Sequence, residues 1–214
     1  DSDFAESAIK IVEKNAEVLG GQIQEITGVD NPNSPAQLKE WLGAAIGRDI
    51  NSLAKGVIPK LIEEAESEAV KEVLTLRQKA SKTSNKKYNA MLACVGSDSR
   101  GRGFFQHYGA SRTGRWAGRI VQLQNLPRNY ISDLEVSREL YKAGDYEVLS
   151  FNFDNIPDVL SQLIRTAFVA PEGKTFAVAD FSAIEARVIA WLAGEQWRLD
   201  VFNSHGKIYE ASAI

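Results

Sequence analysis

Apolar side chains recur every three or four residues through most of the first ninety positions, which is the spacing of helices with one buried face. The first such stretch covers residues 5–19 and is expected to end at Gly20-Gly21. A second helix is predicted to begin at Pro35, with the preceding Ser34 as its N-cap. The same spacing predicts two more helices, over 59–66 and 68–80.

Beyond residue 102 the pattern changes to short apolar runs that are typical of strands. Residues 103–108 are rich in aromatic side chains and are bounded by glycines, and residues 119–123 are predicted to form a second extended piece. A third run, 175–179, is predicted to be a buried strand that ends at Asp180. Helices followed by short strands predict an α+β fold with a mainly antiparallel sheet.

Helices are also predicted in the second half of the chain. Two of them cover residues 132–143, closed by Gly144, and residues 157–165. A third is expected to begin after Ser182, because Ser182 and Glu185 have the spacing of a capping box.

Composition and charge exclude several classes of protein. The chain has 214 residues, 44% of them hydrophobic, and a formal net charge of −3, which suits a soluble globular protein. Its most apolar segment, 176–194, contains Asp180, Glu185 and Arg187, so no membrane span is expected. The single cysteine, Cys94, excludes an intramolecular disulfide and is compatible with a reducing cytoplasm.

The small net charge hides a strongly basic segment between Arg77 and Arg128. Its one acidic residue is Asp98. Its basic residues are Arg77, Lys79, Lys82, Lys86, Lys87, Arg100, Arg102, Arg112, Arg115, Arg119 and Arg128. Segregated positive charge favours a bound polyanion, and the alternative is an ordinary solvated face.

Asp180 is the candidate for metal chemistry. A carboxylate at the end of a rigid strand, facing a helix start, suits metal-dependent phosphoryl transfer, because Mg²⁺ prefers oxygen ligands and leaves positions for water and substrate phosphate. The carbonyl of Phe181 offers a second oxygen. Taken alone, an aspartate before a helix is more commonly a simple cap or turn former.

Four segments, in order, resemble elements of family A DNA polymerases. Residues 180–187 read DFSAIEAR, which is similar to motif A of that family, D-Y-S-Q-I-E-L-R. Upstream, residues 113–118 and 122–127 read TGRWAG and QLQNLP and resemble T-G-R-L-S-S…N-L-Q-N-I-P. Between them, residues 164–171 read IRTAFVAP and resemble I-R-x-A-F-I-A-P. Residues 77–88 resemble the basic end of the thumb in that family. Taken together, the motif sequences are most similar to those of the phage and prophage branch.

The resemblance implies a helical thumb-like region at 1–90 and a partial palm at 91–214, with motif A at 180–187 and an incomplete, mainly antiparallel sheet. Asp180 would bind two catalytic Mg²⁺ ions, with Phe181 offering its carbonyl. Glu185 would be the steric gate that favours deoxynucleotides, and Arg115 would contact the primer terminus through the minor groove. The nucleotide-binding residues would be Ser182, Ile184, Glu185, Arg165 and Tyr209. The DNA-binding residues would be Arg77, Lys82, Lys87, Arg112, Thr113, Arg115, Gln122, Gln124 and Asn125.

Some positions depart from the family pattern. Ala183 and Ala186 replace glutamine and leucine, and Tyr209 stands where many members have a histidine that touches the triphosphate. The stretch between Pro127 and Ile164 is longer than expected and has no assigned role. The chain stops before the fingers lysine and the second catalytic aspartate of the family, so by itself it is expected not to extend a primer.

The sequence thus predicts part of an enzyme for template-directed DNA synthesis in phage or prophage replication, acting in the cytoplasm of a bacterial host. Its partners would be primer–template DNA and deoxynucleoside triphosphates. A non-catalytic nucleic-acid-binding module, in which Asp180 is only a cap, is the alternative. A single-subunit RNA polymerase is disfavoured by Glu185.

Overall fold

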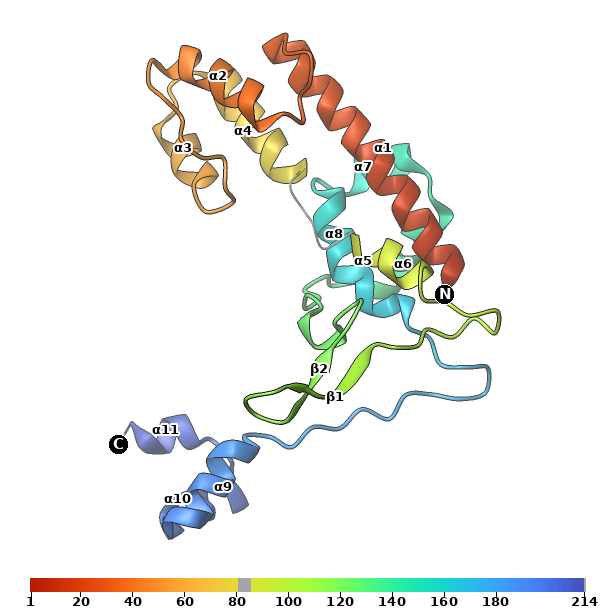
Figure 1. Cartoon of the computed structure of the whole chain (residues 1–214), viewed down its shortest axis with the longest axis vertical. Helices are drawn as coiled ribbons and strands as arrows, with labels where there is room; N and C mark the ends of the chain where they lie inside the picture. The colour runs from red at the N-terminus through yellow and green to blue at the C-terminus, as the bar shows by residue number, and fades with distance from the viewer. Residues whose placement is uncertain (81–85, 214) are drawn as a thin grey trace. The chain divides into compact units, whose positions relative to one another are not determined.

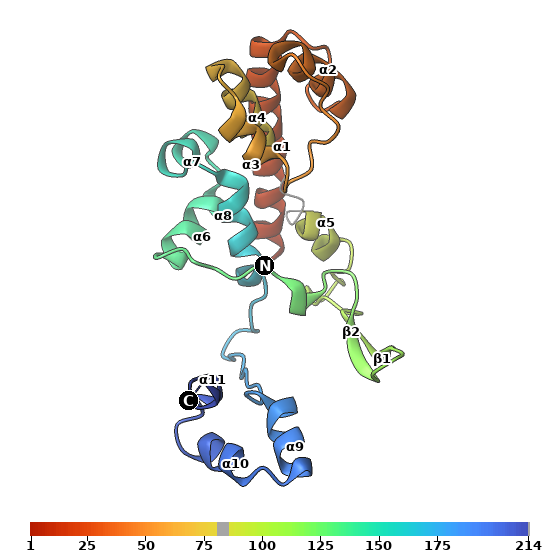
Figure 2. The same ribbon diagram turned by 90° about the vertical axis from the view of Figure 1, so that its left-hand side faces the viewer.

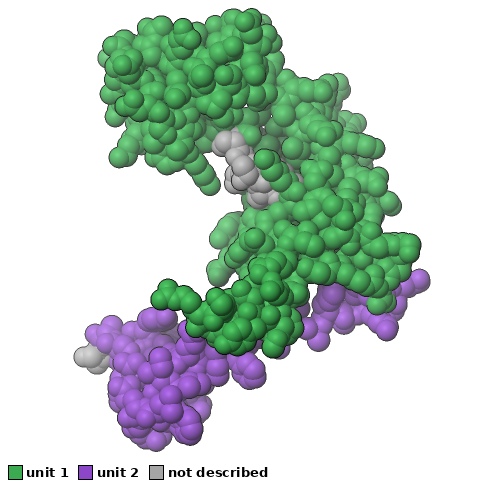
Figure 3. Space-filling model, viewed as in Figure 1, with its two compact units in different colours: residues 1–169 green, residues 170–214 purple. Residues whose placement is uncertain are grey.

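The computed structural model describes residues 1–80 and 86–213, and it divides into two compact units, Asp1–Val169 and Ala170–Ile214 (Figure 3). The predicted phosphate-binding Lys82 lies outside the described residues. Within the described ranges, no helix is long and apolar enough to cross a membrane. The described part is mostly helical with one two-stranded antiparallel sheet, which confirms the α+β class.

The first unit contains eight α-helices among its described residues, and Figure 1 shows α1 running along it. The helices are α1 (Ser2–Thr27), α2 (Pro35–Ile46), α3 (Ile58–Glu64), α4 (Glu68–Ala80), α5 (Lys86–Leu92), α6 (Leu134–Ala143), α7 (Tyr146–Asn152) and α8 (Ile156–Leu163). Two short 3-10 helices, η1 (Leu123–Asn125) and η2 (Ile164–Ala167), complete the helical elements. Helix α1 contacts α4, α5, α6, α7 and α8, so it is the element around which this unit is organised (Figures 1 and 2).

Helix α1 does not end at Gly20-Gly21, as the sequence predicts, but continues to Thr27. Leu19 and Ile23 on either side of the glycines are both buried, so the apolar stripe continues past them. A glycine inside a helix costs only about 1 kcal/mol relative to alanine, and this packing outweighs it. The helix ends instead at Gly28, whose φ of 68° is left-handed.

Three clusters of buried side chains hold the first unit together. The largest contains Phe4 of α1, Tyr88 of α5, Tyr141 of α6 and Leu160 of α8, all fully buried. Two smaller clusters join α2, α3 and α4 to each other and to Ile23 of α1. Residues on both sides of position 90 therefore share one core, and the division of the chain into 1–90 and 91–214 stays a prediction.

The predicted helices at 132–143 and 157–165 are confirmed as α6 and α8, which starts one residue earlier. Gly144 ends α6 as expected. The sequence prediction missed α7, which begins at Tyr146. Its N-cap is Asp145, whose carboxylate accepts hydrogen bonds from the backbone N–H groups of Glu147 and Val148.

Strands β1 (Phe105–Ala110) and β2 (Arg115–Gly118) form an antiparallel hairpin. Phe105 pairs with Gly118 and Ala110 pairs with Arg115, with an irregularity between Gln106 and Ala110. The predicted strand at 103–108 is thus present but shifted by two residues.

The predicted extended piece at 119–123 is wrong. Ile120 and Gln122 have left-handed φ values of 57° and 54°, and the chain turns there into η1. Val121 between them is fully buried, so the turn places one apolar side chain in the core.

The second unit contains α9 (Ile184–Ala193), α10 (Gln196–Asn203) and α11 (Ile208–Ser212). Helix α10 packs on α9 through Phe202, whose ring lies 4.5 Å from the guanidinium carbon of Arg187. A short connection with Gly194 in the left-handed conformation joins the two helices.

Two predictions for this unit are wrong. The segment 175–179 is extended coil rather than a buried strand, with Val178 91% exposed, and no described strand pairs with it. A strand is stable only when neighbouring backbone groups complete its hydrogen bonds, and a lone segment bonds to water instead. The capping box is also absent: α9 begins at Ile184, and Ala183 precedes it with a φ of 52° and no side-chain cap.

Candidate functional site

The candidate residues fall into two groups that belong to different compact units. The basic hairpin β1–β2 and the loop that follows it lie in the first unit, and the motif around Asp180 lies in the second. Each group is described by itself.

The hairpin exposes Arg112, Thr113 and Arg115 at its turn. The turn is closed by Thr113 and Gly114, whose N–H groups both donate to the carbonyl of Ala110 at 3.1 Å and 2.9 Å. Gly114 is required here, because its φ is 69° and a methyl group on it would come within 2.8 Å of the Tyr108 ring. Three of the predicted DNA-binding residues therefore project from one tight turn.

The loop carrying Gln122, Gln124 and Asn125 lies against the same hairpin. The Asn125 side-chain amide donates to Oε1 of Gln122 at 3.0 Å, which ties the two exposed side chains together. The Gln124 amide covers Gly118 of β2 so closely that a methyl group there would come within 2.4 Å of it. The fold thus brings these three residues beside strand β2.

Arg165 fixes the end of this loop. Its guanidinium donates to the carbonyls of Leu126 at 3.0 Å and Pro127 at 3.2 Å, which links η2 to the loop. The residue predicted to bind nucleotide is therefore engaged with backbone, and nucleotide contact stays a prediction.

The remaining basic candidates are partly engaged with the protein. The Lys87 ammonium donates to the carbonyl of Val121, and partial burial lowers the pKa of Lys87. Arg77 lies at the end of α4, and its buried Nε has no hydrogen-bond partner among the described atoms.

Asp98, the one acid of the basic segment, forms a bidentate pair with Arg102, with N–O distances of 2.9 Å and 2.6 Å. The hydrogen bond from Arg102 lowers the pKa of Asp98 well below its usual range. Asp98 therefore stays ionised and offsets the charge of Arg102, while the arginines of the hairpin turn have no acidic residue near them in sequence.

In the second unit, five candidates lie in one stretch at the start of α9: Asp180, Phe181, Ser182, Ile184 and Glu185. All five are exposed. The Arg187 guanidinium donates to the carbonyl of Ser182 at 2.9 Å and so holds the turn that precedes the helix. Tyr209, 90% exposed, lies on α11.

This stretch fits a magnesium site that substrate completes. The Asp180 carboxylate and the Phe181 carbonyl are hard oxygen donors, and Mg²⁺ is commonly held by one or two carboxylates together with substrate phosphates. No described cluster of three or more His, Cys, Asp or Glu side chains is placed to hold a metal on its own. The residues present would thus supply only some ligands of such a site, and the others would come from groups outside it.

Sequence reasoning missed the aromatic side chains of the hairpin. His107 and Trp116 lie opposite each other with ring centroids 5.0 Å apart, and Tyr108 is next to His107 at 6.4 Å. A signal was present in the sequence, because Arg112, Arg115 and Arg119 lie close to these aromatic residues in a stretch that has no acid between Asp98 and Asp133.

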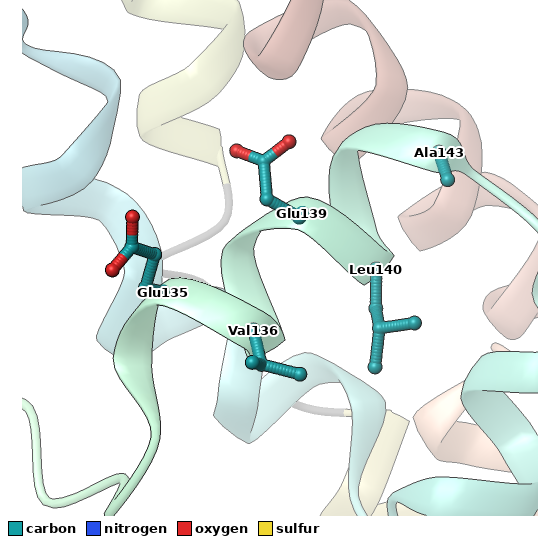
Figure 4. A pocket seen from close by; sticks show the side chains of 5 residues that line it. All are labelled: Glu135, Val136, Glu139, Leu140 and Ala143. Atoms are coloured by element: carbon teal, nitrogen blue, oxygen red, sulfur yellow. The ribbon is translucent and has the colours of Figure 1, made fainter.

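A separate hollow of about 320 Å³ lies on α6 and contains none of the candidate residues (Figure 4). Its lining residues are Glu135, Val136, Glu139, Leu140 and Ala143, all from the same helix. It belongs to the stretch between Pro127 and Ile164 that has no assigned role.

Comparisons with known proteins agree with the motifs. The family described as DNA polymerase family A matches residues 2–214. A DNA polymerase of Bacillus phage SP02 is 57% identical over 213 residues, which is 100% of this chain and 33% of that relative. DNA polymerase I of Pseudomonas aeruginosa is 41% identical over 64 residues, 29% of this chain and 7% of that relative. The thermostable DNA polymerase I of Thermus thermophilus is 44% identical over 64 residues, again 29% of this chain and 8% of the relative. No solved structure matches the chain, which spans about a third of the length of its phage relative.

Proposed function

Because this chain belongs to DNA polymerase family A, we propose that it contributes primer–template binding and one catalytic metal ligand to template-directed DNA synthesis in phage or prophage replication. The observation that carries the proposal is the exposed group of Arg112, Thr113 and Arg115 on a tight turn, with Gln124 of the loop at 122–125 packed against Gly118 at the other end of β2. The setting would be the cytoplasm of a bacterial host.

In this proposal the first unit holds duplex DNA. Arg115 contacts the primer end in the minor groove, where acceptor atoms are common to all base pairs, so that binding does not depend on sequence. Arg112 and Lys87 add affinity through backbone phosphates. Gln122, Gln124 and Asn125 contact the duplex beside them.

The second unit contributes the metal ligand. Asp180 and the carbonyl of Phe181 would hold Mg²⁺. Two such ions, when bound, would supply positive charge that favours deprotonation of the primer 3′-hydroxyl and offsets the charge of the nucleotide triphosphate. Ile184 packs against the nucleotide, and Glu185 crowds the sugar 2′ position. Ser182 and Tyr209 complete the nucleotide contacts proposed for this unit. Arg165, which lies in the first unit, is proposed separately as a nucleotide contact.

The DNA-binding half is tested by fluorescence anisotropy with a labelled primer–template across a salt series. The wild-type chain should bind less tightly as salt rises, because each phosphate contact releases counterions. Arg115→Ala should weaken binding by about five- to a hundredfold, the range for one good contact to DNA. Arg48→Gln is the matched control, since Arg48 pairs with Glu64 and lies outside the basic segment. Equal binding by Arg115→Ala and wild type would refute the assignment.

The catalytic half is tested by replacing the matching part of the Bacillus phage SP02 polymerase with residues 1–214 and measuring primer extension. Asp180→Asn in that chimera should lower the rate at least about a hundredfold, the upper range for loss of a residue that only supports a metal ligand. Glu185→Ala should raise ribonucleotide incorporation. A fully active Asp180→Asn chimera would instead refute the assignment of Asp180 as a metal ligand.

A further inference from the structure

We propose that His107, Tyr108 and Trp116 form a stacking platform for unpaired bases of a DNA strand, beside the basic turn. The inference rests on the proposed function in one respect only, that the ligand is DNA. It adds a single-strand contact made by side chains to which neither the family motifs nor the electrostatics of the segment assign a role.

The platform consists of large aromatic side chains that are exposed to solvent. Tyr108 and Trp116 are each 61% exposed, although both belong to a unit with a well-formed core. Contiguous exposed apolar surface on a monomer marks an interaction site, whereas single exposed apolar residues are common and need no explanation. Phe151 on α7, by comparison, is 90% exposed and takes part in none of the ring contacts found among the described residues.

The rings are held in place by the hairpin itself. Phe104, the residue before β1, packs edge-on against Phe168 at 5.9 Å and anchors the strand to the main core. The N–H of Arg119 donates to the carbonyl of Phe104 at 2.8 Å and closes the base of the hairpin. Rings attached to such a scaffold lose little further freedom when a ligand binds, which favours affinity.

The geometry of the cluster leaves ring faces available. His107 contacts Trp116 at an interplanar angle of 68°, and such an edge-to-face contact uses a face of only one of the two rings. The Tyr108 ring lies against Gly114 at the turn, and the Tyr108 backbone has a left-handed φ of 51°. Strained backbone of this kind persists where the surrounding fold holds a side chain in a required position.

The positive charge around the rings favours binding of a polyanion. Arg112 and Arg115 lie at the turn, and Arg119 is positioned by a 2.7 Å hydrogen bond to Gln106. Aromatic rings interleaved with arginines are the arrangement that binds single strands, since the rings stack on bases and the cations hold the backbone. A base inside a duplex has both faces covered by its neighbours, so the platform is expected to take unpaired bases.

The test measures anisotropy of a labelled dT20 oligonucleotide and of a blunt hairpin duplex with the 214-residue chain. Trp116→Leu and Tyr108→Leu should each weaken binding to dT20 by about tenfold, the order found when one stacked ring is removed. Binding to the blunt duplex should change less than twofold. Trp116→Phe keeps a ring and should restore dT20 binding, while Phe151→Leu is the control for removal of an exposed aromatic residue.

The outcomes separate this inference from the proposed function. Duplex binding without any dT20 binding, or a Trp116→Leu variant that binds dT20 as well as wild type, would overturn the platform alone. Equal losses on dT20 and duplex would also overturn it, because the ring would then support the fold rather than stack on bases. If the wild-type chain binds neither dT20 nor the duplex, the proposed function is refuted as well.

Discussion

Tyr88 shows at the scale of one residue how the core constrains a polar group. Its ring is fully buried and meets the Phe4 ring edge-on at 5.8 Å. Its hydroxyl donates to the carbonyl of Leu160 at 2.7 Å, so the buried polar atom is satisfied and α5 is tied to α8. Burial raises the pKa of Tyr88 above its ordinary value, because the charged form would lose its hydration.

Tyr88→Phe is expected to lower the free energy of unfolding by about 1 kcal/mol, the usual net value of a buried hydrogen bond. Urea denaturation followed by circular dichroism measures it. Tyr209→Phe is the control, since Tyr209 is 90% exposed and should leave the midpoint unchanged. An unchanged midpoint for Tyr88→Phe would show that this bond adds nothing to stability.

Alkaline pH should unfold the protein through the same group. Tyr88 and Tyr141 both have raised pKa values in the folded state, chiefly from burial, whereas an unfolded tyrosine ionises near pH 10. Above about pH 10 the folded state therefore binds more protons than the unfolded state, and stability falls as pH rises. Unfolding free energies measured between pH 8 and 11 should fall less steeply for Tyr88→Phe than for wild type. If the unfolding free energies of the two proteins fall equally with pH, ionisation of Tyr88 is not the cause of the alkaline loss of stability.

At the scale of elements, helix ends decide where the chain changes direction. Helices α1 and α6 both end at a glycine with a left-handed φ, Gly28 at 68° and Gly144 at 77°. The two sites differ in their surroundings. A methyl group at Gly28 would meet open space, whereas one at Gly144 would come within 2.9 Å of Oγ of Ser7.

The two glycines form a matched pair of tests. Gly28→Ala should lower the free energy of unfolding by about 1–2 kcal/mol, the cost of a left-handed conformation for a residue with a Cβ. Gly144→Ala should cost more, because the Ser7 side chain, which donates to the carbonyl of Tyr141 at 2.8 Å, must also move. Urea denaturation of both variants measures the difference, and a double-mutant cycle with Ser7→Ala isolates the contact. Equal costs would show that Ser7 adapts freely.

At the scale of the whole molecule, the buried clusters are distributed unevenly between the units. All three lie within residues 1–169, and they include the longest helix and most of the fully buried side chains. Residues 171–183, which connect the first unit to α9 in the sequence, are exposed throughout. The first unit therefore contains the buried apolar core that cooperative folding requires.

A chain of residues 1–169 is expected to fold by itself and to unfold in one cooperative thermal transition, because its core is complete without residues 170–214. Circular dichroism and near-ultraviolet spectra measure this, and Trp41 and Trp116 serve as tertiary probes. A broad transition with no near-ultraviolet signal would show that the unit depends on the remainder of the chain.

The sequence predicted elements best where local chemistry and burial agree. Helix α4 has the predicted bounds, and α2 starts at Pro35 with the Ser34 hydroxyl accepting a bond from the N–H of Gln37. The prediction failed at Gly20-Gly21 and at 119–123, because long-range packing of Ile23 and Val121 overrode the local signal. Neither burial could be read from neighbouring residues.

For the candidate site, the order of the motifs was sufficient to predict the family, which the comparisons confirm. The roles of single residues stay predictions. The sequence could not indicate that Arg165 bonds the carbonyls of Leu126 and Pro127, or that Lys87 bonds Val121, because these contacts join segments more than thirty residues apart.

Residue types and spacing alone determined the α+β class, most helix positions, the basic segment and the polymerase motifs, because each depends on residues close together in the chain. Only the tertiary structure decided that 175–179 is not a strand, that α1 runs through its glycines, and that His107, Tyr108 and Trp116 gather on one hairpin. The physical reason is that strand pairing, burial and ring contacts are completed by partners distant in sequence, whose positions no local pattern encodes.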